Sequence, residues 1–273
     1  MNKSYRIFAL PYLIWLILLA FFPIVMMLGL IFVQNEGLSF EDVSVSLYSF
    51  GMLFESSTLI AMLNSLLYAL VSTALCILLG YIVAYTIYKS RIKSKFLVLV
   101  VFVLPMWSNL LLRIQAVGSL MENNNILTSL LGISGIDING SPLAIIIGMT
   151  VTYLPFMILP VFNALEKIDK SLNEASLDLG LTEFKTFRKV TLPLSLKGII
   201  SGSIMVFLPT LSGFAIPQIL GKGNVLLVGN IIEQSFKNMN YNFGSLLSII
   251  LLVFIMTALL LVNKADKEGE TLL

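Results

Sequence analysis

Residues 171–198 have the sequence SLNEASLDLGLTEFKTFRKVTLPLSLKG. Ser171 and Glu174 have the spacing of a capping box, in which the serine side chain accepts from a backbone N–H and the glutamate bonds back to the cap residue. A helix is therefore predicted to begin at Ser171. Gly180 can adopt the left-handed backbone conformation that ends such a helix. The first half of the stretch thus predicts a short helix that closes in a glycine turn.

A second short helix is predicted directly after this turn. Thr182 can cap its start, and Phe184, Phe187 and Val190 recur every three residues along one side. Pro193 is expected to end it, because proline lacks the N–H that a helix interior needs. The helix also carries the basic residues Lys185, Arg188 and Lys189. By itself, such a hairpin could be an interfacial amphipathic element that lies on anionic lipid.

The rest of the chain is far more apolar than a soluble protein. Of its 273 residues, 58% are hydrophobic and 12% are charged, and the mean hydropathy is +0.95, whereas roughly a quarter of the residues of soluble chains are charged. The charge-free runs are long enough to cross a hydrocarbon core of about 30 Å as helices. We therefore expect an all-α integral membrane protein with one transmembrane domain over residues 1–273. The six predicted spans cover about 8–33, 59–88, 96–117, 142–165, 198–220 and 243–262.

The distribution of basic residues predicts the orientation. Fourteen of the 17 Lys and Arg residues fall in the two termini and in alternate loops, including the loop that holds the hairpin. Because cytoplasmic loops have an excess of Lys and Arg, both termini and the hairpin between spans 4 and 5 are predicted to be cytoplasmic. Of the other three, Lys222 and Lys237 lie in the predicted outer segment 221–242. Arg113 lies near the outer end of the third span, from which its side chain could reach outward.

The chain lacks the residue types that several kinds of catalytic and metal-binding site require. The chain has no histidine and one cysteine, Cys76, which excludes His-based triads, histidine or multi-cysteine metal sites and disulfides. No acidic or basic residue is predicted at membrane depth, so an ion-driven transporter is disfavoured. The sequence contains no GxxxxGK[ST] loop for ATP. We therefore expect a non-catalytic protein without metal or cofactor; if ATP supplies the energy, a partner binds it.

The hairpin resembles a known family motif. Its spacing is similar to that of the EAA loop of ABC-importer permeases. The motif consists of Glu174-Ala175-Ser176, three residues, Gly180, nine residues and then Val190-Thr191-Leu192-Pro193. The resemblance implies the type-I importer permease fold and a coupling helix that docks on the ATPase subunit. It assigns the coupling role to Glu174, Ala175, Ser176, Gly180, Phe184, Phe187 and Pro193. One departure is Lys197, where family members commonly have a second proline.

Four other stretches narrow the resemblance to the B-type permeases of spermidine/putrescine importers. They cover most of the chain and comprise residues 10–15, 104–113, 122–125 and 207–232. The resemblance implies a polyamine cargo. Gln218 departs from the group, because family members often have an acid there. Related importers of sulfate, ferric iron or phosphonates share the EAA loop, so these cargoes stay open as alternatives.

The resemblance also implies the partners. These are a second, homologous permease, two cytoplasmic ATPase subunits that bind ATP and Mg²⁺, and an extracytoplasmic substrate-binding protein, all in or at a lipid membrane of prokaryotic type and without nucleic acid. Two other classes remain as alternatives. An ATP-independent transporter or channel is disfavoured by the lack of intramembrane acids, and a structural scaffold is disfavoured by the coupling hairpin.

A cargo path is expected along spans 3, 4 and 5. The predicted outer segments contain seven acidic but two basic residues, which would attract a polycation, although the scarcity of outer Lys and Arg is demanded by topology alone. Aromatic faces and carboxylates can replace the water that a cation loses. Arg113 is expected to hold the outer turn through carbonyls or an acid. The candidate path residues are Trp107, Glu122, Tyr153, Phe214, Gln218 and Glu233.

Overall fold

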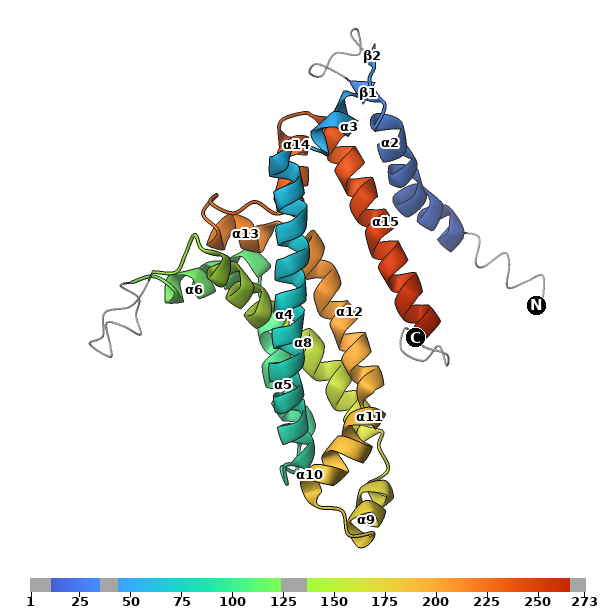
Figure 1. Cartoon of the computed structure of the whole chain (residues 1–273), viewed down its shortest axis with the longest axis vertical. Helices are drawn as coiled ribbons and strands as arrows, with labels where there is room; N and C mark the ends of the chain where they lie inside the picture. The colour runs from blue at the N-terminus through green and yellow to red at the C-terminus, as the bar shows by residue number, and fades with distance from the viewer. Residues whose placement is uncertain (1–10, 35–43, 124–136, 266–273) are drawn as a thin grey trace, which may run out of the picture. The chain divides into compact units, whose positions relative to one another are not determined.

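The computed structural model describes residues 11–34, 44–123 and 137–265. Within this part of the chain, four helices are long and apolar enough to cross a membrane, and two further pairs of bent helices would raise the number to six if each pair is one span. Large apolar side chains are exposed along these helices, as expected where lipid is the solvent. The chain divides into two compact units, and Figure 1 gives their elements.

The smaller unit consists of Met1–Met62 and Val228–Thr257. Its helices are tied by the buried Asn242, whose Nδ2 donates to the Ile31 carbonyl at 2.6 Å, and by a contact between the rings of Phe32 and Phe50 at 6.3 Å. The two strands are two residues long and pair antiparallel, so the fold is helical apart from this bridge. Its elements are η1 (Ile17–Phe21), α2 (Phe22–Leu30), β1 (Val33–Gln34), β2 (Ser44–Val45), α3 (Tyr48–Met52), α14 (Val228–Lys237) and most of α15 (Tyr241–Ala265).

The larger unit consists of Leu63–Leu227 and Ala258–Leu273. The hairpin α9–α10 lies at one end of it, and α6 and α13 lie toward the other (Figure 1). Its elements are α4 (Ser56–Lys89, which begins in the smaller unit), α5 (Lys95–Val103), η3 (Leu104–Trp107), α6 (Leu110–Leu120), α8 (Pro142–Glu166), α9 (Lys170–Asp178), α10 (Glu183–Thr186), η4 (Phe187–Thr191), α11 (Leu192–Leu194), α12 (Leu196–Ser212) and α13 (Ala215–Leu220).

Helix α8 forms the centre of the larger unit, and glycines let its neighbours approach closely. A Cβ added at Gly198 of α12 would lie 2.6 Å from the Pro160 carbonyl oxygen, and one added at Gly80 of α4 would lie 2.7 Å from the Cγ of Met157. Without a hydrophobic drive between helices in lipid, such small-residue contacts allow backbones to pack by van der Waals attraction. The α4–α8–α12 core is therefore fixed by glycine positions.

Two predicted spans are not single helices. The predicted span 96–117 breaks at Ser108, where the segments Lys95–Trp107 and Leu110–Leu120 meet at 98°. Pro105 and the Asn109 cap, whose Oδ1 accepts from the Leu111 and Leu112 backbone N–H groups, explain the break. The predicted span is a pair of helices, and hydropathy does not detect the break because a cap can lie inside an apolar run.

The predicted span 198–220 also breaks. Helix α12 ends at Ser212, Gly213 is extended with ψ 138°, and α13 begins at Ala215. Pro217 lies in the first turn of α13, where a backbone N–H has no helical partner in any case. The last third of the predicted span is therefore a separate short helix.

Prolines also explain the two widened helical turns. The π-helical segments η1 and η4 each end two residues before a proline, Pro23 and Pro193. A proline ring clashes with the carbonyl four residues earlier, and in both cases that carbonyl lies within the π turn. Widening the turn moves the carbonyl aside, so the helix continues through the proline.

Candidate functional site: coupling hairpin and translocation path

The hairpin begins at a different cap from the predicted one. Helix α9 starts at Lys170, and its N-cap is Asp169, whose Oδ1 accepts from the Ser171 N–H at 2.9 Å. The backbone and then the side chain of Ser171 donate hydrogen bonds that lower the pKa of Asp169 below its ordinary value. The predicted Ser171–Glu174 capping box was therefore wrong, because a carboxylate two residues earlier already satisfies the helix start. Glu174 is exposed instead.

The glycine turn is confirmed. Gly180 has φ +81°, and the α9 end forms a Schellman motif. The Leu181 N–H donates to the Ser176 carbonyl at 3.1 Å, and the Gly180 N–H donates to the Leu177 carbonyl at 2.9 Å. An added Cβ at Gly180 would meet no atom within 4 Å, so this position requires glycine for its backbone conformation alone.

The second helix begins as predicted and ends later. Thr182 caps α10 by accepting from the Lys185 N–H at 3.4 Å. The helix then runs through η4 and α11 to Leu194, and the bend of 59° toward α12 lies at Ser195. Pro193 therefore does not end the helix where predicted, because the π turn of η4 accommodates it.

Hydroxyl and amide groups hold the two helices of the hairpin together. Ser176 is 5% exposed, and its Oγ donates to the Asn173 carbonyl at 2.8 Å. Its hydrogen is thereby used, so the Thr186 Oγ1, 2.8 Å away, donates to it. Thr191 Oγ1 donates to Asn173 Oδ1 at 3.1 Å. The predicted coupling residue Ser176 is thus a structural contact within the hairpin.

The predicted apolar stripe of the second helix divides into two parts. The Phe187 ring packs edge-on against Tyr81 at 5.8 Å and Tyr85 at 5.0 Å, centroid to centroid. Phe184 is 71% exposed. Phe187 therefore anchors the hairpin to α4, whereas Phe184 is available to a partner.

An exposed face of the hairpin combines acidic, small and apolar groups. Glu174 and Ala175 lie on the exposed part of α9. The exposed large apolar side chains of the hairpin are Leu172, Leu177, Leu179 and Phe184, of which Leu179 is 84% exposed. Exposed apolar groups clustered on a polar rim mark surfaces that bind proteins or membranes.

The path candidates begin at the helix break of the third predicted span. Trp107 is 87% exposed at the end of η3. Arg113 Nη1 donates to the Pro105 carbonyl at 2.9 Å, and Ser108 Oγ donates to the same oxygen at 2.6 Å. Arg113 therefore bonds a carbonyl of the preceding half-helix and connects the two sides of the break.

Tyr153 and Phe214 come from the other two predicted path spans. Tyr153 of α8 packs against both hydrophobic clusters of the larger unit, and its ring lies 6.2 Å from that of Phe156. Its hydroxyl is 3.7 Å from the position of a Cβ at Gly213, the residue before Phe214. Phe214 and Gln218 are exposed. Tyr153 and the break at Gly213 are therefore neighbours, although they are 60 positions apart in the sequence.

The two acidic candidates differ in their surroundings. Glu122 follows α6 in the larger unit and is exposed. Glu233 lies in α14 of the smaller unit, with a side chain 15% exposed and an Oε1 that is 2.6 Å from Lys237 Nζ. The Glu233 carboxylate is therefore already neutralised by a cation of its own helix, which the predicted role did not include.

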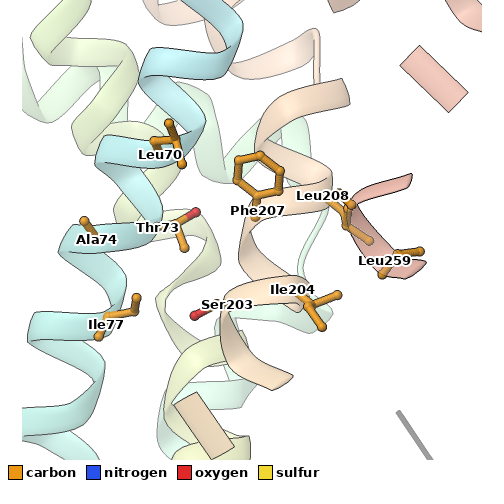
Figure 2. A pocket seen from close by; sticks show the side chains of 10 residues that line it. Leu70, Thr73, Ala74, Ile77, Ser203, Ile204, Phe207, Leu208 and Leu259 are labelled. Carbon is orange, nitrogen blue, oxygen red and sulfur yellow. The ribbon is translucent and has the colours of Figure 1, made fainter. Parts of the chain in front are cut away.

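An apolar cavity of about 410 Å³ is lined by residues of α4 and α12 and by Ala258 and Leu259 of α15. Figure 2 shows Thr73 of α4 and Ser203 of α12 among its lining residues. Both hydroxyls are used within their own helices, since Thr73 Oγ1 donates to the Ala69 carbonyl and Ser203 Oγ to the Ile199 carbonyl, each at 2.7 Å. The residues that line the cavity include no carboxylate, so it offers no opposite charge to a polycation.

The sequence interpretation missed the tyrosines that hold the hairpin. Tyr81, Tyr85 and Tyr88 recur at helical spacing on α4, and Tyr81 bonds Ser195 at 2.9 Å. The spacing was visible as an aromatic stripe. Its partner Ser195, 114 positions away, was not.

Comparison with known proteins defines the class. Residues 76–265 match the family of binding-protein-dependent transport system inner membrane components. The chain belongs to this family, and it is a permease subunit of an ABC importer in the bacterial inner membrane, as the EAA resemblance predicted.

The most similar proteins narrow this class. The chain is 35% identical to the spermidine/putrescine transport system permease protein PotB of Haemophilus influenzae, over 97% of this chain and 95% of the relative. It is also 35% identical to PotB of Escherichia coli K12, over 93% and 94% of the two chains. A bacterial ABC transporter that imports alginate has the same fold, with a TM-score of 0.77, 17% identity and coverage of 98% and 97%. The predicted B-type permease resemblance is confirmed.

Proposed function

We propose that this chain forms, with a second permease, the path by which spermidine or putrescine enters the cell. The observation that carries the proposal is the 35% identity to PotB proteins over nearly the whole of both chains. The excess of acidic residues in the predicted outer segments supports it, because a polycation is attracted there. The chain itself performs no catalysis in this proposal.

The hairpin is the proposed docking element for the ATPase. In the orientation that the basic residues predict, both termini and the hairpin are cytoplasmic. ATP and Mg²⁺ are then bound by the partner ATPase. Phe184, Leu179 and Glu174 support the proposal, because all three are exposed and offer apolar and acidic groups to a partner. Phe187, Ser176 and Pro193 contribute indirectly by fixing the hairpin shape. The whole of residues 1–273 acts as one transmembrane domain in this assembly.

The cargo path is proposed to follow the breaks in the third and fifth predicted spans. A dication or trication needs carboxylates, carbonyls or aromatic faces as it loses water. Trp107, Tyr153 and Phe214 offer rings, Gln218 offers an amide oxygen, and Glu122 offers an exposed carboxylate. Glu233 requires a cargo amine to displace Lys237, so we expect its contribution to be small.

The test is cargo competition in the complete complex. The chain is reconstituted in vesicles with its partner permease, ATPase subunits and binding protein, and ATP-driven uptake of labelled spermidine is measured. We expect unlabelled spermidine or putrescine in excess to abolish the signal. Uptake of sulfate, ferric iron or a phosphonate that polyamines do not inhibit would contradict the proposed cargo and leave the permease class intact.

A further inference from the structure

Helix α4 is longer than a membrane requires. It contains 34 residues, so at about 1.5 Å per residue it is ~51 Å long against a hydrocarbon core of about 30 Å. At least one end therefore projects beyond the apolar layer. The end at Lys89, which is followed by Arg91, Lys93 and Lys95, is the more basic of the two. This end holds a stripe of three tyrosines at positions i, i+4 and i+7, namely Tyr81, Tyr85 and Tyr88.

The tyrosine stripe contacts the hairpin at two levels. The Phe187 ring is held edge-on by Tyr81 and Tyr85, whose own rings stack at 6.2 Å. Farther along α4, the Tyr88 hydroxyl accepts from Asn173 Nδ2 at 3.4 Å, and Asn173 in turn accepts from Thr191. Both helices of the hairpin are thereby joined to α4.

The third contact fixes the bend between the hairpin and α12. Ser195 has no exposed surface and lies at the 59° bend. Its Oγ donates to the Leu192 carbonyl at 3.0 Å, so its single hydrogen is used. The Tyr81 hydroxyl, 2.9 Å away, is therefore the donor to Ser195 Oγ. Both groups are buried, and a buried donor left without its acceptor carries a full desolvation cost.

We propose that Tyr81 and Ser195 are positioning residues that make the hairpin and the end of α4 move as one body during transport. The inference rests on the proposed function, in which the hairpin receives the movement of the ATPase. Through this hydrogen bond, a displacement of the hairpin tilts α4 instead of changing the bend at Ser195. The ring contact of Phe187 alone would permit sliding, because aromatic contacts are weakly directional compared with a buried hydrogen bond.

The first test is a double-mutant cycle on the reconstituted complex. Tyr81→Phe and Ser195→Ala each remove the bond, and each is expected to reduce the stimulation of ATP hydrolysis by spermidine-loaded binding protein about 2- to 10-fold, the equivalent of one net hydrogen bond. The double variant should be no worse than either single one. Basal ATP hydrolysis and the yield of assembled complex should stay unchanged, which separates positioning from folding.

Tyr85→Phe is the matched control. It lies one turn away on the same stripe, and the described residues offer its hydroxyl no hydrogen-bond partner. It should behave as the wild type, whereas Tyr88→Phe should show a weaker effect in the direction of Tyr81→Phe. Unchanged stimulation in both Tyr81→Phe and Ser195→Ala, additive losses, or an equal loss in Tyr85→Phe would overturn the inference.

The second test does not depend on the cargo. Spin labels on cysteines at Lys89 and Lys170, both exposed, report the distance between the end of α4 and the hairpin in the assembled complex. We expect one narrow distance that is the same with and without ATP, and a distribution that broadens on ATP binding in Tyr81→Phe. A wild-type distance that changes on ATP binding would refute the rigid link. Absence of polyamine uptake with a constant distance would refute the proposed cargo alone.

Discussion

The coupling hairpin and the candidate path differ in how their side chains are held. In the hairpin, Ser176 and Thr186 bond each other, and Phe187 packs against Tyr85 of α4. Along the path, the side chains of Trp107 and Gln218 are exposed. A part that transmits movement must be rigid, whereas a part that conducts a hydrated cation must leave its groups available. Substitutions should therefore affect the two regions in different ways.

The largest effect is expected at the glycine turn. Gly180→Val places a β-branched residue at φ +81°, which costs on the order of 1–3 kcal/mol. The turn should open, and stimulated ATP hydrolysis and uptake should fall about tenfold or more in the reconstituted complex. Gly223→Val is the matched control, since Gly223 has φ +80° and equally open space but lies outside the hairpin. Equal losses in both variants would mean that global destabilisation is responsible.

The two phenylalanines of the hairpin should give opposite phenotypes. Phe187→Ala removes a packed ring and should lower the free energy of unfolding by about 3–5 kcal/mol, seen as a lower Tm of the purified chain. Phe184→Ala removes a ring that is 71% exposed and should leave Tm unchanged while weakening ATPase binding. Binding is measured as ATPase retained on the immobilised permease. Normal retention with Phe184→Ala would show that the exposed face has no role in docking.

Path substitutions should change the cargo dependence and leave the hairpin unaffected. Trp107→Ala is expected to raise the spermidine concentration for half-maximal uptake about 2- to 30-fold, the range of one cation–π contact. Glu122→Gln should raise it too, because it removes a negative charge. Tyr153→Phe, Phe214→Leu and Glu233→Gln should have smaller effects. Leu112→Ala, at an exposed site on α6 between Trp107 and Glu122, is the control. Reduced ATPase retention in Trp107→Ala would show that a path residue also affects ATPase binding, and would contradict the distinction between the two regions.

The smallest effect concerns the cap of the hairpin. The pKa of Asp169 is lowered in the folded chain, so its stabilising contribution is complete above its ordinary value of 3.8 and is lost as the pH falls through the folded value. Because the group is fully exposed, we expect the first turn of α9 to lose protection from amide hydrogen exchange, relative to the intrinsic exchange rate at each pH, at acidic pH and without global unfolding. Asp169→Asn should remove this pH dependence. If the protection of these amides still depends on pH in Asp169→Asn, another titrating group causes the dependence.

Local sequence signals predicted the structure of the hairpin better than that of the membrane-spanning helices. The Thr182 cap and the Gly180 turn depend on a few neighbouring residues and are confirmed. The prediction that Ser171 caps the first helix was wrong because Asp169 is also a good cap, and spacing alone does not choose between the two residues. The prediction that Pro193 ends the second helix was wrong because a π turn before a proline lets the helix continue.

Contacts between distant segments could not be predicted. The approach of Tyr153 to Gly213, and of Tyr81 to Ser195, depends on the glycines that bring α4, α8 and α12 together. Hydropathy predicted the six apolar regions, but it treats a broken helix and a straight one alike. The breaks at Ser108 and Gly213 therefore needed the structure.

Site-specific cross-linking from the hairpin is the most direct test of its proposed contact with the ATPase. A photo-reactive residue at Phe184 in the assembled transporter should form an adduct with the ATPase subunit, and the same residue at Trp107 should not. Adducts from Phe184 with lipid alone, in a complex that contains the ATPase, would show that the hairpin lies on the membrane and would contradict the account.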